Sequence, residues 1–113
     1  MRGLGDMGGL MKQAQKQMRD MQRQMKQVED DLRDRVVEGS SGGGMVKVLF
    51  NGMGEAVDVK IDPEILEDED PEFIQEMVLA AIRQGQEKAS ELEEAERGKV
   101  AGKMNLPGLE GLL

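Results

Sequence analysis

The chain has 113 residues and a formal net charge of −8 at pH 7, with 38% apolar, 34% charged and only 2% aromatic residues. This length suits a single small domain, and no stretch approaches the roughly 18 apolar residues of a membrane span. Cys and His are both absent, which excludes thiolate chemistry, Cys/His zinc sites and histidine acid–base catalysis. We expect a soluble cytoplasmic protein with no cofactor, no metal and no small-molecule substrate.

The charge is unevenly distributed along the chain. Residues 1–28 hold six basic and two acidic residues, a net charge of +4, so the remaining 85 residues carry −12. A basic N-terminal segment on an acidic remainder predicts a polarised molecule, which the overall acidic charge conceals.

Residues 7–32 have the apolar spacing of a helix that packs against another helix. Their apolar residues recur at alternating intervals of four and three, at Met7, Met11, Ala14, Met18, Met21, Met25, Val28 and Leu32. We call this set the seam and expect it to be a core or dimer contact rather than a ligand surface, with Met11, Ala14, Met18, Met21, Met25 and Val28 at its centre. A six-residue strand spans about 20 Å, so a sheet would cover only half of such a helix. We therefore expect a homodimer.

The same helix carries a second repeat of basic residues, which we call the basic stripe: Lys12, Lys16, Arg19, Arg23 and Lys26. At about 100° per residue, this stripe lies opposite the seam. A charged stripe is often only the solvated face of a helix. Solvated faces, however, usually mix charge signs, whereas these five like charges repel one another unless an anion binds. Duplex phosphates would suit them, and the lack of Tyr and Trp disfavours stacking on single-stranded bases.

Three short strands are predicted after this helix. An extended segment begins at Val36 and gives way to a loop at 39–44. Residues 45–50 alternate as a strand with Val46, Val48 and Phe50 on one face. Asn-Gly at 51–52 is typical of a tight hairpin, and residues 56–61 form the third strand with Val57, Val59 and Ile61 inward. Together, these three segments predict an antiparallel three-stranded meander with one covered face.

A capped helical turn and a long second helix complete the prediction. Asp62 with Pro63, and Asp70 with Pro71, each have the pattern of an N-cap followed by a proline in the first turn. The second long helix is expected from about residue 72 to 97, with both Phe50 and Phe73 in core positions. We expect glycine-rich residues 1–9 and 98–113 to be flexible tails.

Other motifs have ordinary explanations. The glycines at 42–44 precede a strand and lack the Gly-Lys-Ser/Thr of a P-loop. The acidic run at 67–72 lacks the spacing of a calcium loop and is expected to be solvated. Without a nucleophile elbow or a pair of marked carboxylates, we expect no enzymatic activity.

At this point the residues resemble a known family, the YbaB/EbfC nucleoid-associated proteins. The resemblance begins at Gly9–Gln15 and continues through Val46–Val48, Asn51-Gly52, Ile61–Pro63 with Leu66, and Val78–Ile82. It ends with Met104, Leu106, Pro107 and Gly108, and thus covers nearly the whole chain. Gly85 stands where the family usually has Ala, and glycine in a helix costs roughly 1 kcal/mol relative to alanine, which predicts a weaker second helix.

The resemblance implies an α+β fold of a long N-terminal helix, a three-stranded antiparallel β-meander and a C-terminal helix, assembled as a tweezer-like homodimer. It also implies a bacterial, nucleoid-associated protein that binds double-stranded DNA, alters its conformation and influences gene expression. The candidate phosphate contacts are the basic stripe, with Lys99 and Lys103 as lesser candidates. The alternative is a homodimeric interaction or scaffold module that does not bind DNA directly.

Overall fold

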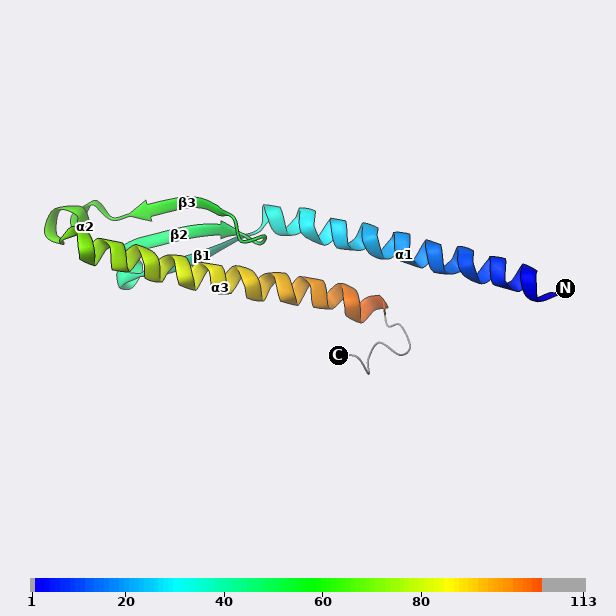
Figure 1. Ribbon diagram of the computed structural model, residues 1–113. Helices are drawn as coiled ribbons and strands as arrows, with labels where there is room; N and C mark the ends of the chain where they lie inside the picture. The colour runs from blue at the N-terminus through cyan, green and yellow to red at the C-terminus, as the bar shows by residue number, and fades with distance from the viewer. Residues whose placement is uncertain (1, 105–113) are drawn as a thin grey trace.

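A computed structural model describes the backbone of residues 2–104 and the side-chain surroundings of residues 7–102. The elements follow the predicted α-β-β-β-α order with one short helix inserted (Figure 1): α1 (Arg2–Asp34), β1 (Val36–Ser41), the 3-10 turn η1 (Gly42–Gly44), β2 (Val46–Asn51), β3 (Ala56–Ile61), α2 (Pro63–Asp68) and α3 (Pro71–Met104). The molecule is elongated, with extents of 83 × 26 × 18 Å.

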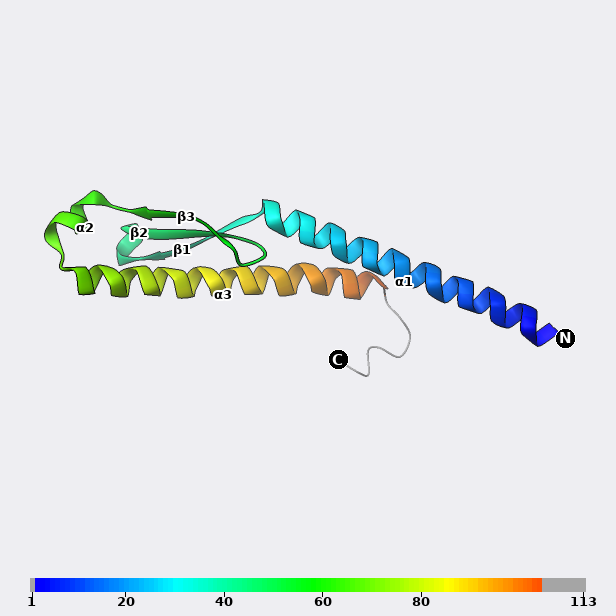
Figure 2. The same ribbon diagram turned by 45° about the horizontal axis from the view of Figure 1, so that its top comes forward.

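The core lies between α3 and one face of the sheet. The strands pair antiparallel in the order β1-β2-β3, and Figure 2 shows α3 running along one face of this sheet. Val46, Val48 and Phe50 of β2 point to that face and are buried, as their alternation predicts. Met77 and Ala81 of α3 pack against them. The sheet and α3 therefore form the body of the molecule.

Strand β1 extends three residues further than predicted. Gly39, Ser40 and Ser41 were expected in a loop, but all three pair with β2. Groups of β1 also bond to α3: Ser41 Oγ donates to the Met77 carbonyl at 2.6 Å, and the Ser40 N–H donates to Gln84 Oε1 at 2.7 Å. These bonds satisfy polar groups that an edge strand would otherwise leave open, so a Gly/Ser composition typical of a loop is ordered by its neighbour.

Two glycines permit this close contact. A Cβ on Gly39 would overlap the carbonyl oxygen of Ala81, and a Cβ on Gly85 would overlap the Phe50 ring. Gly85 is thus not merely a weak point in α3. Its missing side chain leaves room for the core aromatic residue.

The β2–β3 connection is a longer loop than the predicted tight hairpin. Asn51 is buried and organises it: its Oδ1 accepts the N–H groups of Met53 and Glu55 at 3.0 and 3.1 Å. Gly52 lets this loop approach the end of α1 closely, because a Cβ at this position would lie 2.7 Å from the Leu32 carbonyl oxygen. The Asn51-Gly52 pair therefore packs the loop against the end of α1 and does not form a two-residue turn.

Strand β3 is not covered as predicted. Val59 pairs with Val48 and therefore shares its face of the sheet. However, α3 lies over β1 and β2, which leaves Val57 and Val59 54% and 51% exposed. The prediction of an inward Val57 and Val59 gave the correct face for Val59, but no element of the described chain buries either residue. Ile61 is partly buried against the core.

The two helix caps form as predicted. Asp62 Oδ1 accepts the Glu64 N–H at 2.9 Å, and Asp70 Oδ1 accepts the Phe73 N–H at 2.8 Å. Phe73 itself is 45% exposed, so its assignment to the core was wrong.

Both long helices extend beyond their predicted ends. Helix α1 begins at Arg2, and α3 continues past Arg97 to Met104. Helix therefore includes residues 2–9 and 98–104 of the segments expected to be tails. Residues 105–113 lie outside the described part of the chain.

Candidate nucleic-acid interface

Most of α1 projects away from the body. Every residue from 7 to 19 is exposed, and we call this segment the arm. Figure 1 shows it extending past the end of α3. The expectation that the sheet would cover half of this helix was wrong, because α3 occupies the covered face of the sheet instead.

The C-terminal end of α1 is anchored to the body. Leu32 is fully buried, and its carbonyl accepts the Gly52 N–H at 2.7 Å. Two long-range ion pairs add to this junction: Arg97 with Glu29 at 3.5 Å and Arg35 with Glu96 at 2.9 Å. No sequence spacing pointed to these pairs, because their partners are more than sixty residues apart.

The basic stripe lies on one exposed face of α1 and is barely compensated. Among the side chains that the structure describes, only Arg23 of the stripe has an ion-pair partner, Asp20, at 3.9 Å between two exposed side chains. Within the described residues, no carboxylate lies within 4 Å of Lys12, Lys16, Arg19 or Lys26. An exposed pair of this length contributes about 0–1 kcal/mol, so the stripe retains its positive charge.

Lys99 lies near the body end of this stripe. It borders the cleft between α1 and α3 that Gln24 and Gln27 also line, and Gln27 follows Arg23 by one helical turn. Its Nζ donates to Glu96 Oε1 at 3.0 Å. This bond, assisted by Arg35, lowers the pKa of the Glu96 carboxyl below its usual value, so Lys99 carries a compensated charge. Lys103 lies in the last turn of α3, and its side chain is outside the described set.

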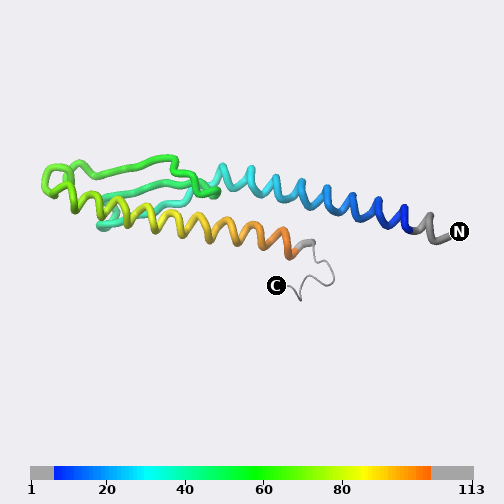
Figure 3. Tube along the Cα trace, in the orientation of Figure 1, coloured from blue at the N-terminus to red at the C-terminus, as the bar shows by residue number. Residues whose placement is uncertain are grey.

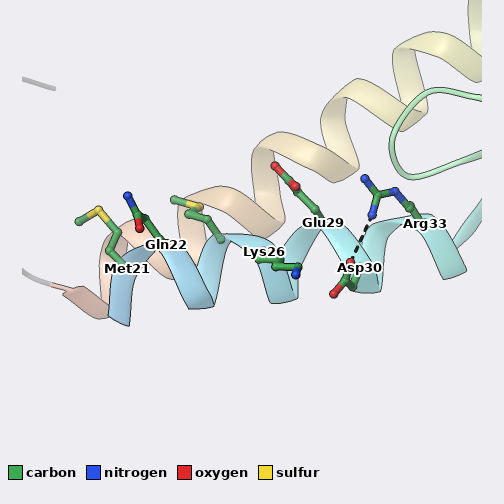
Figure 4. Close-up of a pocket in the computed structure, with 7 residues that line it drawn as sticks. Met21, Gln22, Lys26, Glu29, Asp30 and Arg33 are labelled. Carbon is green, nitrogen blue, oxygen red and sulfur yellow. Dashed lines mark hydrogen bonds and ion pairs between the residues drawn. The ribbon is translucent and has the colours of Figure 1, made fainter. Parts of the chain in front are cut away.

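The seam divides into two parts. Met21, Met25 and Val28 are partly buried near α3, whereas Met11, Ala14 and Met18 are exposed. The partly buried part borders a shallow groove of about 490 Å³ lined by Met21, Gln22, Met25, Lys26, Glu29, Asp30 and Arg33 (Figure 4). Arg33 and Asp30 pair at 3.2 Å on its rim. Within the described residues, the seam is therefore buried or partly buried only at its body end. The predicted seam did not include Leu10, which lies beside it on α1 and is 64% exposed.

Other kinds of site are not found in the part of the chain that the structure describes. Across those residues, no three Cys, His, Asp or Glu side chains are placed to hold a metal ion. None of the described helices combines the length and apolar character needed to cross a bilayer.

A small α+β body that presents a projecting helix with an uncompensated cationic face is typical of proteins that bind polyanions. The sequence identifies the family: residues 4–104 match the YbaB/EbfC DNA-binding family, and the chain belongs to it. This is a family of nucleoid-associated DNA-binding proteins rather than a known class of enzyme.

Relatives and a solved structure agree with this assignment. A nucleoid-associated protein of Pelotomaculum thermopropionicum is 42% identical over 91% of this chain and 98% of its own. One from Caldanaerobacter subterraneus is 42% identical over 83% of this chain and 85% of its own. The crystal structure of an uncharacterised Helicobacter pylori protein has a TM-score of 0.63 and 36% identity, covering 77% of this chain and 87% of that one.

Proposed function

We propose that this protein is a homodimer of the bacterial nucleoid that binds duplex DNA through phosphate contacts from the basic stripe and alters the conformation of the duplex. The main support for this proposal is that the basic stripe, which is barely compensated by carboxylates, lies on a helix that projects from an acidic body. Each phosphate neutralised by a Lys or Arg releases condensed counterions, which supplies the binding free energy. The contacts are to the backbone, so sequence preference is weak. The protein therefore resides in the cytoplasm with the nucleoid.

Two arms are needed to change the shape of a duplex. A dimer would hold two stripes at a set separation and favour DNA conformations that reach both of them. Lys99 and Lys103 would add contacts at the base of each arm. Lys99 must first release its ion pair with Glu96 before it can contact a phosphate. It would therefore contribute less binding free energy than the residues of the stripe.

The uncovered face of β3 supports a dimer. Val57 and Val59 leave apolar surface exposed on β3, and Leu79 of α3 is also 45% exposed. The α3 residues Val78 and Ile82 pack against the core but are only partly buried. Apolar surface of this kind on a small body favours association with a second copy. We therefore place the dimer contact here rather than on the exposed part of the seam.

The DNA contact is tested by charge reversal on the arm. With five to ten phosphate contacts, a plot of log affinity against log salt has a slope of about −4.5 to −9. The triple variant Lys16→Glu, Arg19→Glu, Arg23→Glu should lose most duplex binding at 50 mM salt. The matched single variants Arg19→Glu and Arg83→Glu make the same change on two exposed helical arginines. Only Arg19→Glu should weaken binding and flatten the slope. Equal effects of these two would refute the assignment to the stripe.

The dimer contact is tested by placing a charge on the open face of β3. Val59→Asp should shift the mass measured by light scattering from dimer to monomer at micromolar concentration. Val36→Asp is the control, because Val36 is a similarly exposed valine of the same sheet. A Val59→Asp protein that remains dimeric would exclude this face as the interface.

The alternative is an interaction module whose arm binds an acidic protein surface. The same uncompensated stripe would support it. Capture experiments with and without nuclease distinguish the two functions, since partners bridged by DNA disappear after digestion. Partners retained after nuclease, combined with no binding of purified protein to duplex, would favour the module.

A further inference from the structure

A shallow groove lies at the end of the body that carries α2, and we call it the end groove. Its volume is about 220 Å³, and Met45, Ile65, Phe73 and Met77 supply its apolar lining. Phe73 is 45% exposed. Small-molecule sites usually measure about 300–1,000 Å³, so the end groove suits a single apolar side chain of a protein partner better than a small ligand.

The rim of the end groove is acidic. Glu64, Asp68 and Glu69 line the groove together with its apolar residues, and all three are exposed. Within the described residues, no Lys or Arg nitrogen lies within 4 Å of their carboxylates. An apolar groove with such a rim favours a partner that presents an exposed apolar side chain next to cations.

The arm of this protein has that complementary surface. Met11 is 63% exposed, Lys12 follows it, and Lys16 lies one helical turn beyond Lys12. Successive residues are about 100° apart around a helix, so an arm with Met11 in the groove holds Lys12 to the side, over the rim. Methionine sulfur also makes favourable contacts with aromatic rings, and Phe73 lines the groove.

The arm cannot reach the end groove of its own chain. The two lie at opposite ends of a molecule 83 Å long, and Figure 3 shows the blue arm pointing away from the green turn that carries α2. The buried Leu32 anchors α1 in this direction. A contact between arm and groove therefore joins two copies. Because it uses a different surface on each copy, it can repeat from one molecule to the next.

We propose that the end groove binds the arm of a second copy, with Met11 in the groove and Lys12 and Lys16 against its acidic rim. Met11 fits better than Met18, because Asp20 follows Met18 by two residues and would be repelled by the rim. No acidic residue lies within four positions of Met11. The contact is small and charged, so it is weak and sensitive to salt. A polyanion bound to the basic stripe would compete with it for both lysines.

Sedimentation velocity of the full-length protein without DNA tests this contact. At low salt, the sedimentation coefficient should rise between low and high micromolar concentration, and about 0.5 M salt should reverse the rise. Met11→Gln should lower the association constant at least about tenfold through the lost burial of one apolar side chain. Met18→Gln, at an equally exposed methionine of the arm, should leave the constant unchanged. Equal effects of the two variants, or a natural chain that does not associate at low salt, would refute the proposal.

Charge reversal on the rim tests the groove. The double variant Asp68→Lys, Glu69→Lys should abolish the association. Both lysines would lie at the C-terminal end of α2, where positive charge suits the helix dipole and the fold is retained. The control, Glu87→Lys with Glu91→Lys, makes the same charge change at two exposed positions of α3 and should still associate. A rim variant that associates like the natural chain would mean that the arm binds another surface, such as the arm of a second copy.

Mixing two variants tests the head-to-tail direction of the contact. The Met11→Gln protein keeps an intact groove, and the Asp68→Lys, Glu69→Lys protein keeps an intact arm. At a concentration where neither associates alone, an equimolar mixture should associate, because the arms of one protein enter the grooves of the other. Restored association would also show that both variants are folded. A mixture that stays dissociated would overturn the proposal. DNA is absent throughout, so these outcomes are independent of the proposed function.

Discussion

The body and the arm are built on opposite principles. In the body, β1, β2 and α3 approach so closely that Gly39 and Gly85 have no room for a Cβ, and side chains of α3 bond to the β1 backbone. In the arm, every residue from 7 to 19 is exposed. Net negative charge lies with the body and uncompensated positive charge with the arm. We therefore expect the stability of the fold and the proposed polyanion binding to depend on separate residues, so that each can be altered without the other.

The largest loss of stability is expected at the closest backbone contact of the body. Gly39→Ala places a methyl group against the Ala81 carbonyl and forces β1 away from α3. Overpacking against backbone should lower the free energy of unfolding by about 3 kcal/mol. Urea denaturation at a constant protein concentration measures this change.

Gly98→Ala is the matched control for that substitution. Gly98 lies in α3, and a Cβ there would meet nothing within 4 Å. Alanine should therefore raise the free energy of unfolding by up to about 1 kcal/mol through helix propensity. If both variants were neutral, the close packing of β1 on α3 would not describe the molecule in solution.

A smaller effect is expected where the arm joins the body. Leu32 is the only seam residue that is fully buried, and Leu32→Ala leaves a cavity beside Gly52. The expected loss is about 2–3 kcal/mol. The same change at the exposed Leu66 should cost less than about 0.5 kcal/mol. Similar values for both leucines would show that α1 is not anchored through Leu32.

How much of this the sequence predicts depends on whether the cause is local. The alternation of β2, the caps at Asp62 and Asp70, and the opposite placement of seam and stripe on α1 all follow from short-range spacing, and the structure has each of them. That the stripe contacts phosphates stays a prediction, because geometry alone identifies no ligand.

The errors arose where a distant element decides the outcome. Gly39 to Ser41 have loop composition, yet α3 supplies hydrogen bonds that keep them in the sheet. Val59 alternates correctly but is exposed, because α3 lies over the other two strands. Gly85 has poor helix propensity but fits the Phe50 ring. None of these contacts leaves a periodic signal in the sequence.

The smallest expected effect concerns charge at the junction of arm and body. Glu96 accepts hydrogen bonds from Arg35 at 2.9 Å and Lys99 at 3.0 Å, and its pKa is lowered, chiefly by the Lys99 bond. A lowered carboxyl pKa stabilises the folded state above the ordinary pKa, and this contribution is lost as the pH falls through the lowered value. Glu96→Gln should therefore lower the Tm slightly at pH 7 and not at all at strongly acidic pH.

Two features separate this charge effect from lost packing. High salt should shrink the Tm difference at pH 7, since Arg35 and Lys99 are exposed and their attraction to the half-buried Glu96 is screened. Glu91→Gln, at an exposed carboxylate of α3 with no ion pair within the described residues, should change the Tm at neither pH. A Glu96→Gln difference that persists unchanged in acid and in high salt would mean that this side chain joins arm to body by shape alone. In that case the Arg35–Glu96 ion pair would contribute nothing to holding α1 against the body.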